Sequence, residues 1–276
     1  MVAPLVKKPI KAALARFPVL DALARRFVWR AVRPSLFFHE PEMRYFHSLA
    51  RDSMDIAVDV GAAMGSYCWI LQGPARKIYA FEPGRIHNAC LKRASFQSNV
   101  EVVRAAVGSA PGKVRLYTRG QAPDDRFSAS ISLQNPVTQA AAIVDEVEQV
   151  TLDGFFAERL SADRSIDLIK IDVEGYELDV MQGALGLIDR FRPLIICEIE
   201  ARHNPRYREV FGLLAARGYA VFAMGEAGFR PFTDDGIEHV QLPEDLDKRL
   251  HGGALDKIKY VNNFIFQHPD SKIQVG

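Results

Sequence analysis

Short apolar segments alternate with amphipathic segments along most of the chain after residue 50. The apolar segments are rich in Val, Ile, Leu and Phe, as is typical of strands buried on both faces of a sheet. They predict strands at 55–60, 77–81, 100–107, 166–171 and 194–199. The stretches between them predict helices at 66–72, 86–95, 176–189 and 205–217. Strands separated by helices form βαβ units, so the pattern predicts an α/β fold with helices on both faces of a mostly parallel sheet.

The rest of the pattern is shorter or weaker. Residues 113–118 predict a strand in a hairpin or edge extension, 151–156 a helix start, and 219–224 and 263–266 the last strands. Residues 119–145 mix Gly, Pro, Asp, Ser and Asn without a clear period. Loops of this length are commonly lids over a binding site or mobile segments, and both interpretations remain open here.

The first 35 residues carry eight basic side chains and one acidic side chain, a net charge of +7 on a protein of net charge +1. Residues 5–33 predict two short helices divided at Pro18. Such a segment could lie on an anionic membrane surface or grip a partner, or it could pack on the domain with solvated Arg and Lys. We therefore expect a basic helical extension at 1–50 and one domain at 51–276.

Composition limits the class of protein. Hydrophobic residues make up 48% and charged residues 25% of the chain, the usual mix for a soluble enzyme. The small net charge gives no reason to expect a nucleic acid partner. Cys68, Cys90 and Cys197 lack ligand or disulfide spacing. With neither a secretory signal nor an apolar run of about 18 residues, a cytoplasmic protein is expected. No feature predicts an oligomeric state.

The segment after the first predicted strand carries the features of an adenosine site. Gly61 permits a sharp turn and close approach to a ligand, and Gly65 permits tight packing of the next helix. Glu82 ends the second strand, where a carboxylate can accept hydrogen bonds from both ribose hydroxyls. The alternative is that the two glycines serve only the strand–helix turn, but this would not explain carboxylates at Asp59 and Glu82.

The glycine spacing distinguishes between adenosine cofactors. A dinucleotide fingerprint, G-x-G-x-x-G, would place glycines where this chain has Ala63 and Ser66. A pyrophosphate therefore has little room against the loop. S-adenosylmethionine has no phosphate, and its ammonium and sulfonium groups favour nearby carboxylates such as Asp59. The spacing thus favours S-adenosylmethionine over a nicotinamide dinucleotide.

Several blocks resemble the FkbM family of methyltransferases. They are VDVGAAMG (58–65), AFEPG (80–84), AAVG (105–108), TLDGFF (151–156), LIKIDVEGYELDVMQGA (168–184) and RPLIICEIE (192–200). The resemblance implies a Rossmann-like class I fold with a seven-stranded sheet. It also implies methyl transfer from S-adenosylmethionine, usually to a hydroxyl of a natural product or sugar. One departure is Ala63, where family members often have Asn.

The predicted cofactor contacts combine this loop with the ends of the neighbouring strands. They are Asp59, Gly61, Ala62, Met64, Gly65, Ser66, Glu82, Pro83, Ala106 and Asp172.

Candidate catalytic residues lie at or just after the ends of the predicted strands 166–171 and 194–199. A hydroxyl is a weak nucleophile, so a base should take its proton as the oxygen attacks. The candidates are Asp172, Glu174, Glu198 and His203, with Glu200 as a further possible base. Asp172 is expected to face the methionine part of the cofactor and Glu174 the acceptor, with Lys170 able to pair with either.

Alternatives remain for each of these residues. Asp172 or Glu174 could cap the helix near Tyr176, and His203 could be a surface histidine. A metal site of Asp172, Glu198 and His203 is conceivable but lacks ligand spacing, and no metal is predicted. For the whole chain, the competing functions are a nicotinamide-dependent oxidoreductase and a non-catalytic protein that kept the fold. The leading expectation is an O-methyltransferase with a small-molecule or glycan acceptor.

Overall fold

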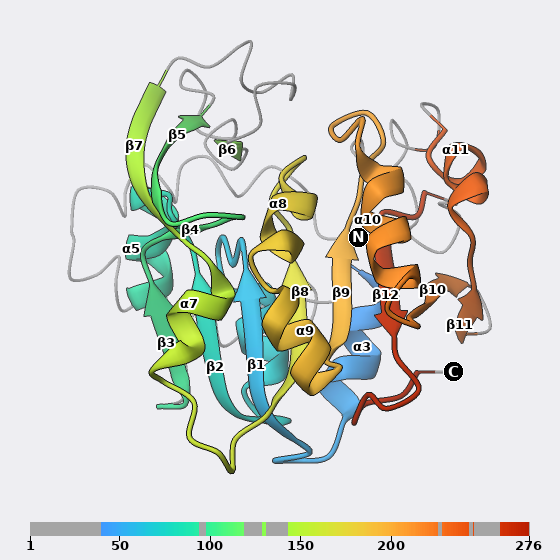
Figure 1. The fold of residues 1–276 in the computed structure, drawn as a ribbon, viewed down its shortest axis with the longest axis horizontal. Helices are drawn as coiled ribbons and strands as arrows, with labels where there is room; N and C mark the ends of the chain where they lie inside the picture. The colour runs from blue at the N-terminus through green and yellow to red at the C-terminus, as the bar shows by residue number, and fades with distance from the viewer. Residues whose placement is uncertain are drawn as a thin grey trace, which may run out of the picture.

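The computed structural model describes residues 40–93, 98–118, 129–130, 143–225, 228–242, 245 and 260–275. Its centre is a sheet of eight described strands in the order β11-β10-β12-β9-β8-β1-β2-β3 (Figure 1). Five adjacent strands are parallel: β3 (Val100–Val103), β2 (Ala75–Phe81), β1 (Met54–Val60), β8 (Ile166–Ile171) and β9 (Leu194–Glu198). The antiparallel edge consists of β12 (Asn263–Gln267), β10 (Ala220–Gly225) and β11 (Gly228–Pro231).

The sheet confirms the predicted mostly parallel α/β architecture, with one correction to the strand count. Seven strands were implied and eight are present among the described residues. The additional strand, β11, pairs antiparallel with β10 beyond the expected edge. Strand order reverses at β1, which lies between β2 and β8. In open α/β sheets, ligands bind at the carboxyl ends of the strands at such a switch point.

Helices cover both faces of the sheet. On the face toward the viewer in Figure 1 lie α7 (Leu152–Ala157), α8 (Glu177–Gln182), α9 (Leu185–Phe191) and α10 (Tyr207–Ala215). On the opposite face lie α3 (Pro41–Ser48), α4 (Ser66–Leu71) and α5 (Arg85–Arg93). A short 3₁₀ turn at Asp234–Gly236 leads into α11 (Ile237–Val240). This is the helix-on-both-faces arrangement that the alternating pattern predicts.

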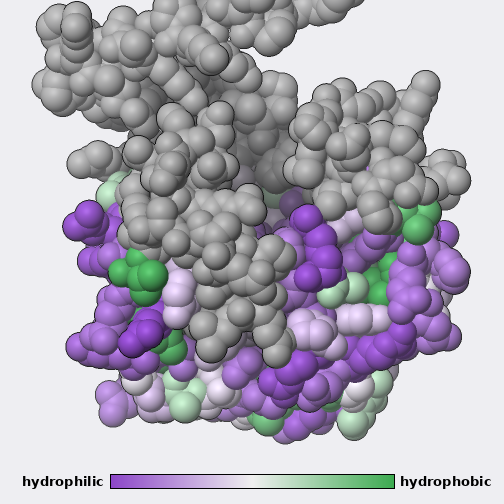
Figure 2. Space-filling view, turned by 90° about the horizontal axis from the view of Figure 1, so that it is seen from above, coloured by the Kyte–Doolittle hydropathy of each residue, from purple (hydrophilic) through white to green (hydrophobic). Residues whose placement is uncertain are grey.

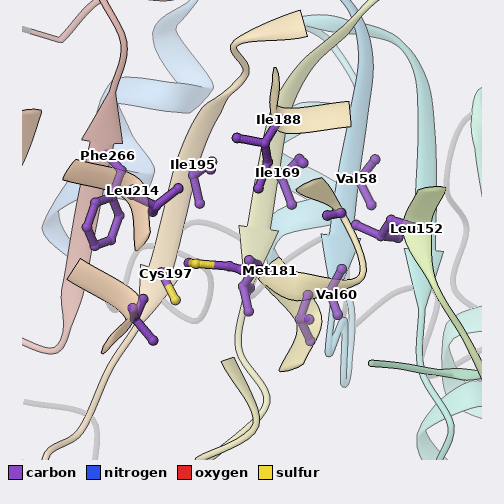
Figure 3. Packing of buried hydrophobic residues seen from close by; sticks show 14 of the residues in the cluster. Val58, Val60, Leu152, Ile169, Met181, Ile188, Ile195, Cys197, Leu214 and Phe266 are labelled. Atoms are coloured by element: carbon purple, nitrogen blue, oxygen red, sulfur yellow. The ribbon is translucent and has the colours of Figure 1, made fainter. Parts of the chain in front are cut away.

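The larger core forms where strand side chains meet α7 to α10. Figure 3 shows Ile188 of α9 between Ile169 of β8 and Ile195 of β9. Met181 of α8 lies beside Cys197 of β9, and Leu152 of α7 lies beside β1. Every residue of β8 is buried. Burying one Ile, Leu or Met side chain contributes about 1.5–3 kcal/mol to the free energy of folding, so the apolar residues of the central strands stabilise the sheet.

The second core lies under α3 and α4. Met43 and Phe46 of α3 are buried together with Ile70 and Leu71 of α4. Residues 41–48 fall within the predicted extension at 1–50, yet they pack on the domain. The predicted basic helices at 5–33 lie outside the described residues.

A second, smaller sheet lies above the carboxyl ends of β1 to β3 (Figure 1). Its order is β4-β7-β5-β6, from β4 (Ala106–Val107), β7 (Ile143–Val150), β5 (Gly112–Thr118) and β6 (Ala129–Ser130). The single strand predicted at 100–107 is therefore wrong, because β3 pairs with β2 and β4 pairs with β7 in the other sheet. The strand at 113–118 is confirmed, and it pairs antiparallel with β7.

Two further predictions need correction. The weakly patterned segment 119–145 runs into β7, which pairs with β5 and whose side chains alternate between exposed and buried from Glu146 to Gln149. Apart from residues 129–130 and 143–145, that segment and its lid interpretation lie outside the described residues. The helix predicted at 176–189 is two helices, α8 and α9. The predicted helix is interrupted at Gly183, the C-cap of α8, where an added Cβ would lie 2.0 Å from the carbonyl oxygen of Gly108.

The described surface is mainly hydrophilic. Seen from above, hydrophobic residues stand on it in small separate groups (Figure 2). Large exposed hydrophobic side chains in the described residues are limited to Val144 and Leu242. Within that same part of the chain, no helix has the length and apolar character needed to cross a bilayer.

Candidate active site

A pocket opens at the carboxyl ends of β1, β2 and β8, where the strand order reverses. It encloses about 720 Å³ of empty space, part of which is open to solvent. Its lining combines strand ends, the loops after them and two strands of the small sheet. The lining residues are Val60, Gly61, Ala63, Phe81, Glu82, Pro83, His87, Ala105, Ala106, Val107, Leu116, Asp172, Val173 and Glu174. We call this the cofactor pocket.

Gly61 is required by a close approach of two loops. Its φ is +78°, and a Cβ built on it would lie 1.8 Å from the carbonyl oxygen of Asp172. The amide of Asp172 in turn donates to the carbonyl of Val60 at 3.0 Å. The loops after β1 and β8 therefore touch through their backbones, which leaves no room for a side chain at residue 61.

Two non-glycine residues of the pocket also have left-handed backbone conformations. Ala63 has φ of +44° and Glu174 has φ of +45°. For an L-residue this region costs roughly 1–2 kcal/mol, and Asn tolerates it better than Ala. The Asn that the FkbM resemblance suggests at residue 63 suits this backbone. Strained residues that gather at one pocket mark it as functional.

Glu82 is held by the loops on both sides of it. Its Oε2 accepts from the amide of Ala63 at 3.0 Å and its Oε1 from the amide of Gly84 at 2.7 Å. Burial raises the pKa of this carboxyl to about 7, although the two amide hydrogen bonds oppose the shift. The carboxylate is thus fixed in the pocket with lone pairs that can accept from ribose hydroxyls.

The small sheet supplies an apolar wall, of which the sequence analysis predicted only Ala106. Ala106 and Val107 of β4 and Leu116 of β5 line the pocket opposite Phe81. Only the tertiary fold of β4 to β7 brings Leu116 to the carboxyl end of β2. An apolar wall beside a fixed carboxylate suits an adenosine, with the base against the wall and the ribose at Glu82.

His87 is another pocket residue that sequence reasoning missed. It lies one turn into α5, is buried, and has Nδ1 3.9 Å from Oε1 of Glu82. Burial lowers its pKa, which favours the neutral imidazole. The only sequence signal was its place soon after the AFEPG segment.

The predicted cofactor residues divide into two groups. Gly61, Glu82, Pro83, Ala106 and Asp172 line the pocket. The residues that support it from outside the lining are Asp59, Ala62, Met64, Gly65 and Ser66. Gly65 is the left-handed N-cap of α4. For both groups, contact with a bound cofactor stays a prediction.

Asp59 lies behind the pocket rather than in it. Its carboxylate is buried and accepts a hydrogen bond from Sγ of Cys68 at 3.2 Å. Burial raises its pKa to about 6, with the nearby ammonium of Lys170 opposing the shift. From this position it acts on the site through the field of its charge.

A second pocket adjoins the first, and we call it the acceptor pocket. It holds about 310 Å³ of empty space. Its lining is almost entirely charged: Asp172, Glu174, Glu177, Glu198, Glu200, Arg202 and His203. Asp172 and Glu174 line both pockets. The structure therefore brings all four predicted catalytic residues to one place, at the ends of β8 and β9.

A histidine and a carboxylate are paired in the acceptor pocket. Nδ1 of His203 lies 3.4 Å from Oε2 of Glu200, and both side chains are largely buried. Arg202 also donates to Oε2 of Glu200 at 2.5 Å. A carboxylate at Nδ1 favours the tautomer with its proton on that nitrogen and leaves Nε2 as the proton acceptor.

Two of the carboxyl groups that line the acceptor pocket, Glu198 and Glu177, have raised pKa values. Glu198 accepts from Nδ2 of Asn262 at 2.5 Å, and burial together with the charges of Asp172 and Glu40 raises its pKa well above the ordinary value. Glu177 accepts from the amide of Gly175 at 2.6 Å, and burial raises its pKa to about 7. Both groups are held rigidly by neighbouring donors.

The capping alternative finds no support at the start of α8. The N-cap residue is Tyr176, and no side-chain cap hydrogen bond is made there. Among the described residues, no group of three or more His, Cys, Asp or Glu side chains is placed to hold a metal ion.

Comparison with known proteins decides the family. The model of the methyltransferase FkbM domain matches residues 59–221, more than half of the chain. The chain belongs to the FkbM methyltransferase family. The matched domain is of the S-adenosylmethionine-dependent methyltransferase class and has a class I, Rossmann-like fold. No curated protein sequence matches it significantly.

Solved structures with a similar arrangement are distant. An FkbM methyltransferase from Methylobacillus flagellatus KT has 16% identity and a TM-score of 0.47, over 82% of this chain and 50% of that one. This chain thus spans about half the length of that protein. A Streptococcus mutans methyltransferase crystallised with S-adenosylhomocysteine has 8% identity and a TM-score of 0.43, over 83% and 96%. An rRNA methylase from Streptococcus thermophilus has 11% identity and a TM-score of 0.40, over 82% and 93%.

The residues present fit the cofactor of the FkbM family. Because Gly61 has no side chain, a ligand can lie close to the backbone there. The Glu82 carboxylate can accept hydrogen bonds from ribose hydroxyls. Phe81, Val107 and Leu116 offer an apolar surface for an adenine. The pocket has no glycine-rich nest for a pyrophosphate, because residue 63 is Ala and residue 66 is Ser.

Proposed function

We propose that this FkbM methyltransferase is an O-methyltransferase that acts on a hydroxyl of a sugar, a glycan or a glycosylated natural product. The observation that carries the proposal is the His203–Glu200 pair, 3.4 Å apart, in a pocket that shares two residues with the cofactor pocket. A proton acceptor beside the methyl donor is what a hydroxyl nucleophile needs.

His203 is the proposed general base. S-adenosylmethionine, when bound, supplies an electrophilic methyl group on a sulfonium. His203 takes the acceptor's hydroxyl proton at Nε2 as the oxygen attacks, and Glu200 stabilises the imidazolium from Nδ1. Asp172 and Glu174 stand between the two pockets, where Glu174 orients the acceptor toward the cofactor.

The character of the acceptor pocket supports a sugar. Five carboxylates, one guanidinium and one imidazole line it. Carboxylates accept hydrogen bonds from several hydroxyls at once, and Arg202 can donate to ring or hydroxyl oxygens. A flat apolar acceptor would desolvate these charges without replacing their hydrogen bonds.

The test is methyl transfer from S-adenosylmethionine carrying a labelled methyl group into a panel of sugars and oligosaccharides. We expect label in an alkali-stable methyl ether. His203→Asn should lower the turnover rate by about 10²–10⁴-fold while the affinity for S-adenosylhomocysteine changes less than about threefold. Label in an amine or an ester, or full turnover by His203→Asn, would overturn the proposal.

We further propose that the enzyme works in the cytoplasm, where residues 1–35 bring it to the inner membrane face. The support is the net charge of +7 on that segment against −6 on the remainder. The full chain should sediment with vesicles containing anionic lipid, and a chain lacking residues 1–35 should not. Equal sedimentation of the two would exclude the membrane contact.

A further inference from the structure

Lys170 is a charged side chain buried inside the sheet. It lies in β8, opposite Asp59 of β1, and only 1% of the side chain is exposed. Its Nζ lies 3.5 Å from Oδ2 of Asp172 and donates to the carbonyl of Ile171 at 3.4 Å. A buried ammonium is strongly unfavourable without such partners.

The surroundings of the ammonium keep it charged and in place. Nζ lies 4.9 Å from the centre of the Tyr67 ring, within the range of a cation–π contact. Burial lowers the pKa of Lys170, but the carboxylates of Asp172, Glu198, Glu40 and Asp59 outweigh burial and raise it. The hydroxyl of Tyr67 lies 3.0 Å from Oε2 of Glu40, which ties α4 to the segment that begins α3.

Stability alone does not account for this lysine. Buried ion pairs are often replaced by apolar side chains with no loss of stability, because desolvation offsets their attraction. Asp172 differs from the lysine's other partners in its position. Its side chain is 38% exposed and lines both pockets. The Lys170 ammonium is therefore paired with the Asp172 carboxylate, which lies at the boundary between the two pockets.

We propose that Lys170 is a positioning residue, whose buried ammonium fixes the Asp172 carboxylate toward the amino-acid part of the bound cofactor. The proposal rests on the S-adenosylmethionine site, and on Asp172 contacting the cofactor. It does not depend on the identity of the acceptor.

The test is a double-mutant cycle on binding of S-adenosylhomocysteine, measured by calorimetry without any acceptor. Wild type is compared with Asp172→Asn, Lys170→Met and the double variant. We expect each single change to weaken binding about tenfold, since each removes a charge-assisted contact or its geometry. The double variant should be no more than about twofold weaker than Asp172→Asn, because Lys170 acts through Asp172.

A matched control separates this role from a general loss of charge. Lys272 pairs with Asp167 at 2.8 Å near the other end of β8, and Lys272→Met should leave the affinity unchanged. Thermal unfolding identifies any variant that does not fold. If Lys170→Met does not fold, Lys170→Gln keeps a polar donor without the charge and enters the same cycle.

Three results would overturn the inference. Losses that multiply to about a hundredfold in the double variant would show that Lys170 acts independently of Asp172. Unchanged binding by Lys170→Met beside weakened binding by Asp172→Asn would show that the lysine does not position the carboxylate. Unchanged binding by Asp172→Asn would remove Asp172 from the cofactor site and leave the proposed transfer to a hydroxyl intact.

Discussion

The two pockets of this methyltransferase lie side by side, share Asp172 and Glu174, and are built in different ways. The cofactor pocket is shaped by backbone: Gly61 against the carbonyl of Asp172, and two amides on the carboxylate of Glu82. The acceptor pocket is shaped by charged side chains from the ends of β8 and β9 and the loop after β9.

This difference separates what the fold requires from what the acceptor requires. A backbone cradle tolerates few substitutions at its close contacts, so it suits a cofactor that does not change. Charged side chains on strand ends and loops can be exchanged without moving the backbone, so they suit a variable acceptor. Changes on the cofactor side should therefore affect folding and cofactor binding together, whereas changes on the acceptor side should affect turnover alone.

The largest effect is expected from Gly61→Ala. A Cβ would meet the carbonyl of Asp172 at 1.8 Å, on a backbone with φ of +78°. The two loops must separate, so we expect a loss of about 2–4 kcal/mol in the free energy of unfolding and no measurable binding of S-adenosylhomocysteine. Chemical denaturation and calorimetry measure the two effects.

Gly73→Ala is the matched control, because a Cβ there meets nothing within 4 Å. It should change the free energy of unfolding by less than about 1 kcal/mol and leave binding intact. If Gly61→Ala behaves like Gly73→Ala, the cofactor pocket is not set by the backbone contact.

An intermediate effect is expected from Glu82→Gln. Ribose hydroxyls donate to the ionised carboxylate, whose pKa in the ligand-free protein is about 7. Below that pH, binding must first remove a proton. Wild-type affinity for S-adenosylhomocysteine should therefore fall about tenfold between pH 8 and pH 6. Glu82→Gln should bind about 10–100-fold more weakly at pH 8 and lose this pH dependence.

Glu200→Gln provides the comparison on the acceptor side. Glu200 lines only the acceptor pocket, so this variant should keep both the wild-type affinity and its dependence on pH. Equal losses of affinity for S-adenosylhomocysteine in Glu82→Gln and Glu200→Gln would show that cofactor binding is not confined to the cofactor pocket.

The smallest effect concerns stability and pH. Burial, with help from the charge of Glu40, raises the pKa of Glu42 from 4.5 to about 8. Below pH 4.5 the group is protonated in both states. Between pH 4.5 and 8 the unfolded chain releases the proton and the folded chain keeps it, so the contribution of this group to stability falls as pH rises. We expect a free energy of unfolding about 1–3 kcal/mol lower at pH 8 than at pH 6.

Glu42→Gln should reduce this difference, measured by urea denaturation at the two pH values. Glu146→Gln alters an exposed pair with Lys113 and should leave it unchanged. A wild-type stability that rises from pH 6 to pH 8 would contradict the assignment.

The sequence predicted the central strands closely because burial on both faces imposes a continuous apolar run. The run at 166–171 matches β8 residue for residue, and 194–199 exceeds β9 by one residue. Prediction from the sequence failed where pairing in the second sheet decided the structure. The segment from Val100 to Val107 is apolar at six of its eight positions, yet β3 and β4 belong to different sheets. The alternation of β7 was obscured because the apolar Val144 is exposed and the polar Gln149 is buried.

The site was predictable to the extent that strand ends converge. Gly61, Glu82, Asp172, Glu198 and His203 all come to the predicted edge because parallel strands end there. His87 and Leu116 were missed, since a helix residue and a residue of the small sheet reach the pocket only through tertiary packing.

By itself, the sequence determined the fold class and the strand ends that carry chemistry, because these depend on hydrophobic period and local spacing. It also determined the family, because the blocks that resemble FkbM methyltransferases are short runs of consecutive residues. Tertiary structure alone decided that Asp59 lies behind the cofactor pocket and that His203 lines the same pocket as Asp172 and Glu174. It also decided that Lys170, Tyr67 and Glu40 meet within the protein. Contacts between residues distant in sequence depend on how layers pack, and periodicity along one strand or helix carries no information about the layer that covers it.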